Sequence, residues 1–66
     1  MKKMDFDFMF EVVGEDSDIC GEQFFVECAT KPEAWKIAHE NFPDEELHYC
    51  GRYTIEEAEW IGLDTY

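Results

Sequence analysis

Apolar and acidic side chains alternate over most of residues 4–13, which read MDFDFMFEVV. On an extended chain, one side would carry only apolar residues, namely Phe6, Phe8, Phe10 and Val12. The other side would carry the acids Asp5, Asp7 and Glu11. Such alternation predicts a half-buried strand, because successive side chains of a strand point to opposite faces. We therefore expect one face of this strand in the core and a row of carboxylates in water on the other.

Two further strands are predicted downstream, at residues 23–29 (QFFVECA) and 47–53 (LHYCGRY). Both have the aromatic content and the period of two that are typical of strands. In the later strand, simple alternation places Leu47, Tyr49 and Tyr53 on one face and His48, Cys50 and Arg52 on the other. Gly51 interrupts this strand and predicts a β-bulge.

Two helices are predicted to begin at Thr30 and Thr54, each of which precedes a glutamate by three residues in the capping-box pattern. Pro43 ends the first helix at about residue 42, and the second is expected to fray near Gly62. The two helix starts share the pattern T-x-x-E-A-x-x-I-small, 24 residues apart. This similarity indicates either a duplicated unit or, as we favour, convergence of two capped helices.

The predicted fold is a single small α+β domain spanning residues 1–66, with the element order β-β-α-β-α. A right-handed crossover through the first helix gives a three-stranded, mainly antiparallel sheet of order 2-1-3, with residues 4–13 central. The main helix is expected to pack on the face that bears Phe6, Phe8 and Phe10. The opposite face is expected to be largely exposed and acidic, and it would present Asp5, Asp7, Met9, Glu11, Phe25 and Glu27.

The charge balance limits the classes of partner. The chain has 17 Asp and Glu against 5 Lys and Arg, a formal net charge of −12, yet 45% of its residues are hydrophobic. A field this negative repels nucleic acids and anionic membranes and attracts basic surfaces. No stretch approaches the ~20 apolar residues that cross a bilayer. We expect no direct contact with nucleic acid or membrane, and the odd number of cysteines without a close pair favours a cytoplasmic location.

Metal and catalytic chemistry have little support in the sequence. Zinc would have to be held by ligands without the usual paired spacing, namely Cys20, Cys28, His39, His48 and Cys50. The loop acids Asp16, Asp18 and Glu22 do not fit the EF-hand spacing of a calcium site. No glycine-rich phosphate loop and no recognisable nucleophile–base pair are present. We expect a protein that is not an enzyme and uses no cofactor, with a zinc-binding module as a third hypothesis.

The acidic surface is the feature that needs a function, because −12 exceeds the magnitude of about 2 to 8 that solubility alone calls for. Same-face residues two apart on a strand are ~6.6 Å from each other, close to two nucleotide rises of B-DNA. The first hypothesis is that acids meet the Lys and Arg of a partner's nucleic-acid groove, with two apolar anchors. The predicted contact residues are Asp5, Asp7, Met9, Glu11, Glu15, Asp16, Asp18, Phe25 and Glu27. The alternative is a small regulatory adaptor, as a monomer or as a homodimer formed through an edge strand or an aromatic face. Its interface would depend on Phe25, Tyr53 or Trp60 more than on the acids.

A strand that ends in VECA, followed by TKPEAWKIA and then by another strand, resembles a plan found in very small proteins of phages and mobile elements. Some anti-CRISPR proteins share the β-β-α-β arrangement, and several acidic ones are DNA mimics. The resemblance covers about residues 4–54 and transfers no individual functional residue. It implies an inhibitor that binds a CRISPR effector or another host nucleic-acid enzyme, in the bacterial cytoplasm if the protein is phage-encoded.

Overall fold

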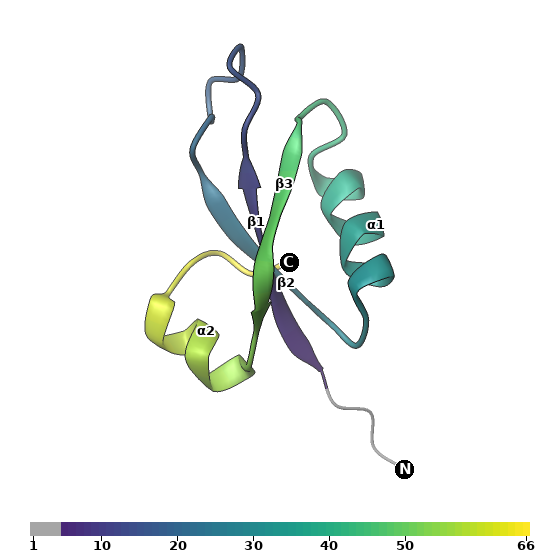
Figure 1. Cartoon of the computed structure of the whole chain (residues 1–66), viewed down its shortest axis with the longest axis vertical. Coiled ribbons are helices and arrows are strands. Elements are labelled where there is room, and N and C mark those ends of the chain that lie inside the picture. The colour runs from purple at the N-terminus through teal and green to yellow at the C-terminus, as the bar shows by residue number, and fades with distance from the viewer. Residues whose placement is uncertain (1–4) are drawn as a thin grey trace.

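A three-stranded antiparallel sheet lies between two helices in the computed structural model of the chain (Figure 1). The structure describes residues 5–66, so Met4, the predicted start of the first strand, lies outside the described residues. The elements in chain order are β1 (Phe6–Val12), β2 (Gln23–Cys28), α1 (Lys31–Asn41), β3 (Leu47–Tyr53) and α2 (Ile55–Ile61).

β1 is the central strand and pairs antiparallel with both β2 and β3, in the order β2-β1-β3. In the hairpin with β2, Phe6 lies opposite Cys28 and Asp7 lies opposite Glu27. This arrangement confirms the predicted α+β fold and the predicted strand order. The alternation of residues 6–12 is the physical cause, because the central strand has to supply side chains to both faces of the sheet.

The first core lies between the sheet and α1. Phe8, Phe10 and Val12 of β1 face Ala34 and Ala38 of α1, and the β2 side chains of the same face complete the cluster. Both alanines are fully buried, and their small side chains let the helix approach the sheet closely. The ring of Phe10 meets several aromatic neighbours, among them Phe24 with ring centroids 5.7 Å apart and Trp35 at 4.9 Å. The predicted core face of the first strand is therefore confirmed.

A second core lies on the other face of the sheet, which α2 covers. Met9 and Phe25 pack there with Ala58 of α2, and Tyr53 and Leu63 are partly buried against them. The expectation that this face is largely exposed is therefore wrong. Asp7 is 3% exposed, Met9 6% and Phe25 0%. The cause is the short connection after β3, which turns the following helix back across the face on which Met9 and Phe25 stand.

A β-bulge in β3 changes which of its side chains meet which core. Met9 lies opposite Gly51 and Phe10 opposite Tyr49, so the residue between them, Cys50, has no partner on β1. Gly51 has φ +147°, a conformation that glycine adopts at little cost. The predicted bulge is confirmed. It reverses the alternation, so that Tyr53 faces the second core rather than sharing a face with Leu47 and Tyr49.

Arg52 is moved by the same bulge to the α1 side of the sheet. It lies opposite Phe8, and its guanidinium carbon is 4.4 Å from the centroid of the Phe6 ring. The expectation that Arg52 shares a face with His48 and Cys50 is therefore wrong.

The two predicted helix caps differ in the structure. At Thr54 the capping box is present, since Thr54 N–H donates to Glu57 Oε1 at 2.9 Å and Glu57 N–H donates to Thr54 Oγ1 at 3.1 Å. Thr30 is also an N-cap, but its side chain makes no capping hydrogen bond. Pro32 explains part of this difference. An N-cap side chain accepts a hydrogen bond from a backbone N–H in the first turn of the helix, and proline has no N–H to donate.

The residues after α2 run along the outer edge of β2. Phe25 N–H donates to the carbonyl oxygen of Asp64 at 2.8 Å, and Tyr66 N–H donates to the carbonyl oxygen of Phe25 at 2.8 Å. Glu27 N–H donates to the carbonyl oxygen of Tyr66 at 3.0 Å. This edge of the sheet is therefore covered by the chain itself. Within the described residues, no such pairing covers the outer edge of β3.

Candidate functional site

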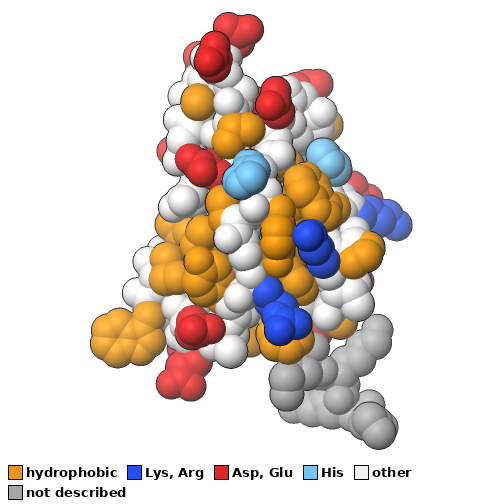
Figure 2. Space-filling model, viewed as in Figure 1, with side chains coloured by type: hydrophobic (Ala, Val, Ile, Leu, Met, Phe, Trp, Pro, Cys, Tyr) orange, Lys and Arg blue, Asp and Glu red, His pale blue; other side chains and the backbone are white. Residues whose placement is uncertain are grey.

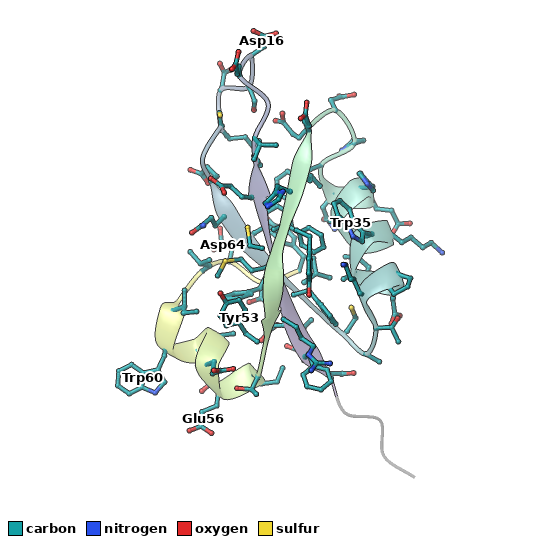
Figure 3. The ribbon with its side chains drawn as sticks, viewed as in Figure 1. Asp16, Trp35, Tyr53, Glu56, Trp60 and Asp64 are labelled. Carbon is teal, nitrogen blue, oxygen red and sulfur yellow. The ribbon has the colours of Figure 1, made fainter. Side chains whose placement is uncertain are left out.

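Acidic side chains gather at one end of the elongated molecule, which measures 43 × 23 × 15 Å (Figure 2). There the loop between β1 and β2 meets the connection between α1 and β3. Ser17 Oγ donates to Glu45 Oε2 at 2.9 Å, and Val13 N–H donates to the carbonyl oxygen of Glu46 at 2.9 Å. We call this end the acidic tip, made of Glu15, Asp16, Asp18, Asp44, Glu45 and Glu46. Figure 3 shows Asp16 at its extremity.

A second acidic region lies on α2, and it contains an exposed tryptophan. Trp60 is 87% exposed and extends away from the body of the molecule, as Glu56 does (Figure 3). Glu56, Glu59 and Trp60 line a shallow hollow together with Ile55. We call Glu27, Glu56, Glu59 and Trp60 the α2 surface. A tryptophan that buries so little of its large apolar area contributes little to the fold, which makes it a candidate contact for a partner.

Beneath the α2 surface, a cavity of about 280 Å³ lies between the sheet and α2. Three carboxylates line it: Asp7 of β1, Glu27 of β2 and Glu59 of α2. Asp7 Oδ1 is buried and has no hydrogen-bond partner among the described residues. Burial raises the pKa of the Asp7 carboxyl above its ordinary value, and the charges of Glu27 and Glu59 raise it further. This cavity therefore concentrates negative charge without a donor for its most buried oxygen.

Within residues 5–66, every Lys and Arg lies on the α1 side of the sheet. Lys31 and Lys36 belong to α1, and Arg52 lies over the Phe6 ring. The Lys31 ammonium lies 4.1 Å from the centroid of the Tyr49 ring, also on this side. In the described part of the molecule, the α1 side of the sheet thus carries all the cations together with the acids Glu33 and Glu40, whereas the α2 side carries acids and no cation.

The predicted contact residues fall into separate places. Those exposed to solvent are Asp5, Glu15, Asp16, Asp18 and Glu27, whereas Glu11 is half-buried. Those buried under α2 are Asp7, Met9 and Phe25, so the two expected apolar anchors belong to the second core. The structure brings Asp7 and Glu27 together as cross-strand neighbours. It leaves the loop acids at the other end of the hairpin, ~26 Å away along an extended chain.

The sequence interpretation missed the α2 surface. Glu56 and Glu59 belong to the second predicted helix, but the face of the sheet to which this helix returns could not be deduced from its pattern. Trp60 was predicted as an interface residue of the adaptor alternative, and its exposure follows from a short helix in which Ala58 is the residue that faces the sheet. The contribution of residues 44–46 to the acidic tip was also missed, since it depends on tertiary contact.

The candidate metal ligands remain dispersed. Among residues 5–66, no three His, Cys, Asp or Glu side chains are arranged to hold a metal ion. Cys20 is exposed, Cys28 is buried and Cys50 is half-buried, and all three are free thiols. Burial raises the pKa of the Cys28 and Cys50 thiols, which disfavours the thiolate form that a nucleophile or a zinc ligand needs.

Comparisons with known proteins leave the surface chemistry as the basis for inferring function. No protein-family model matches the sequence, and no curated protein or solved structure gives a significant match. Within the described range 5–66, neither helix has the length and apolar character needed to cross a bilayer.

Proposed function

We propose that this protein is a non-enzymatic inhibitor that binds the basic, nucleic-acid-binding surface of another protein. The observation that carries the proposal is that, within residues 5–66, the α2 side of the sheet carries acids without a Lys or Arg, together with the exposed Trp60 on that side. A partner that normally binds phosphates offers Lys and Arg, and these would meet Glu27, Glu56 and Glu59. The net charge of −12 would steer the encounter over a distance and speed association.

Trp60 supplies the apolar contact that an acidic surface alone lacks. Tryptophan is enriched at the energetic centres of protein interfaces, and its ring face attracts Arg and Lys. Glu56 and Glu59 flank it in the same hollow. The combination fits a basic partner surface better than a purely apolar one.

The mimicry that we propose rests on charge density and not on a regular phosphate-like spacing. The predicted row of Asp5, Asp7 and Glu11 is interrupted in the structure, since Asp5 precedes β1 and Asp7 is buried. The acidic tip and the α2 surface instead place charge near the two ends of the molecule (Figure 2). The resemblance to small phage proteins makes a CRISPR effector, or another bacterial nucleic-acid enzyme, the partner to test first.

The test is a competition experiment with matched charge changes. The tagged protein is used to capture partners from bacterial lysate and then from purified candidate enzymes, with and without excess duplex DNA. A Glu56→Lys/Glu59→Lys/Trp60→Ala variant should lose at least tenfold in affinity, because it removes both the charge complementarity and the anchor. Glu33→Lys/Glu40→Lys changes the same amount of charge on α1 and is the control, with an expected loss of less than threefold. Binding that survives both DNA competition and the α2 changes would contradict the proposal.

The uncovered edge of β3 favours a second candidate function, an adaptor that pairs through this edge with another chain or with a second copy of itself. Edge strands present unpaired backbone groups that readily accept another strand. Light scattering across protein concentration distinguishes this function. A dimer that strengthens as salt screens the charge, and that ignores DNA, would favour the adaptor.

A further inference from the structure

We propose that the cavity between the sheet and α2 is a binding site for one arginine guanidinium, inserted by the partner protein. The site is formed by the three carboxylates of Asp7, Glu27 and Glu59. The inference rests on the proposed function only for the source of the arginine.

Bringing Asp7, Glu27 and Glu59 together in one cavity costs stability. Asp7 and Glu27 are directly opposite on neighbouring strands, where side chains start ~4.5–5.5 Å apart and like charges are destabilising. Glu59 adds a third charge from α2 above them. The repulsion among these carboxylates lowers the stability of the fold. A cation bound in the cavity would offset this repulsion.

A buried oxygen of Asp7 lacks a hydrogen-bond partner among the described residues. Asp7 is 3% exposed, and its Oδ1 accepts no hydrogen bond from the described residues. Buried polar atoms without a partner are rare in native proteins, because each loses its hydration without compensation. The Asp7 side chain is one of the residues that line the cavity with the other two carboxylates. It therefore marks where a donor group would bind.

The size and lining of the cavity fit a long basic side chain. At about 280 Å³ it is roughly nine times the volume of one water molecule in the liquid, so a polyatomic cation fits better than a bare ion. Ile55, Ala58 and Leu63 supply apolar walls for the methylene stem of a long basic side chain. A guanidinium is the cation of choice because it pairs with carboxylates through parallel hydrogen bonds and is weakly hydrated.

A partner's side chain can reach the cavity from the α2 surface. Ile55 and Glu59 line both this cavity and the hollow beside Trp60. A side chain that crosses the α2 surface therefore reaches the cavity past Glu59. The groups that face Asp7 are Glu27 from β2, Tyr53 from β3 and Glu59 from α2, and none of them is a cation.

The test uses the whole protein and a defined probe, N-acetyl-arginine methylamide, with the neutral citrulline analogue as its control. Side-chain carboxyl signals are followed by ¹³C NMR during the titration. We expect saturable shifts at Asp7, Glu27 and Glu59, and a lower apparent pKa of Asp7 when the probe is bound. The citrulline analogue should give none of these changes. Shifts of equal size at exposed acids such as Glu33 would overturn the site.

Four variants separate the explanations. Glu59→Gln changes an exposed residue and should weaken probe binding at least fivefold without affecting the fold, and Asp7→Asn should abolish it. Glu33→Gln on α1 should leave probe binding unchanged. A Lys2→Ala/Lys3→Ala variant should also bind the probe as the unchanged protein does. A large gain in that variant would mean that the chain's own lysines compete for the cavity, and it would overturn the assignment to a partner.

The proposed function and this site can fail separately. If the probe binds and Asp7→Asn leaves partner affinity unchanged while the α2 changes reduce it, the arginine insertion is wrong and the inhibitor function stands. If the probe binds at Asp7 but the partner proves to bind no nucleic acid, the site stands and the proposed function is wrong.

Discussion

At the scale of single residues, Asp7 is an acid on the central strand that the fold removes almost completely from water. Its two nearest acidic influences, Glu27 and Glu59, carry the same charge, and burial is the largest cause of its raised pKa. The folded protein therefore holds the Asp7 proton more tightly than the unfolded chain. Protonation of Asp7 stabilises the fold, and this contribution is lost as the pH rises through the folded-state pKa.

Asp7→Asn should therefore raise the free energy of unfolding at pH 7 by about 0.5–1 kcal/mol, the scale of one like-charge cross-strand pair. The gain should shrink as the pH falls and should be lost below the ordinary value of 3.8, where the wild-type carboxyl is protonated in both states. Urea denaturation at several pH values measures the difference. Asp5→Asn, an exposed acid on the same segment, is the control and should change little. A gain that grows on acidification would contradict the pKa direction.

At the scale of elements, the two helices begin with the same sequence pattern and pack on opposite faces of one sheet. Thr30 and Thr54 are both N-caps, and the alanines four residues later, Ala34 and Ala58, are both buried against the sheet. Two requirements account for the repeated pattern. Each helix needs a residue that can begin it, and each needs a small residue where it comes closest to the sheet. This supports convergence rather than duplication as the origin of the pattern.

The caps allow a matched comparison. Thr54→Ala removes a hydrogen bond that is present and should cost about 1 kcal/mol of stability. Thr30→Ala removes a side chain that makes no capping bond and should cost clearly less. Both are measured by chemical denaturation under the same conditions. Equal losses would show that the two caps are energetically alike.

The strand pattern and the strand order were predictable because alternation reports directly on which faces are buried. Phe8 and Phe10 identified the first core without any tertiary information. The second core was missed because Met9 and Phe25 were interpreted as isolated apolar residues on an acidic face. The helix α2 covers this core, and its position depends on the direction in which the chain leaves β3. The cavity around Asp7 could not be predicted either, since it joins side chains from three elements.

At the scale of the whole molecule, the net charge of −12 is confined to a body only 15 Å across its shortest dimension. Like charges at such separations repel one another and favour expansion of the chain. The Debye length falls from about 30 Å at 0.01 M salt to about 3 Å at 1 M. Salt therefore weakens the repulsion between the acidic tip and the α2 surface, and also the repulsion among the acids of each of these two surfaces.

Raising the NaCl concentration from 0.01 M to 1 M should thus increase the melting temperature. Each 1 kcal/mol of repulsion that is relieved corresponds to about 4–8 °C for a domain of this size. Calorimetry measures the change, and sucrose at the same osmolality is the control for effects unrelated to charge. A melting temperature that stays constant or falls with NaCl would contradict the repulsion argument.

The position of β1 has a consequence for synthesis on the ribosome. The strand that ends up in the centre of the sheet emerges first, whereas the residues that cover Met9 and Phe25 emerge about 50 residues later. At ~5–20 residues per second, the interval is roughly 3 to 10 s. During that time the nascent chain carries an apolar strand without its partners β3 and α2. The protein is thus most exposed to chaperones and to wrong pairing before residues 55–66 have left the ribosome.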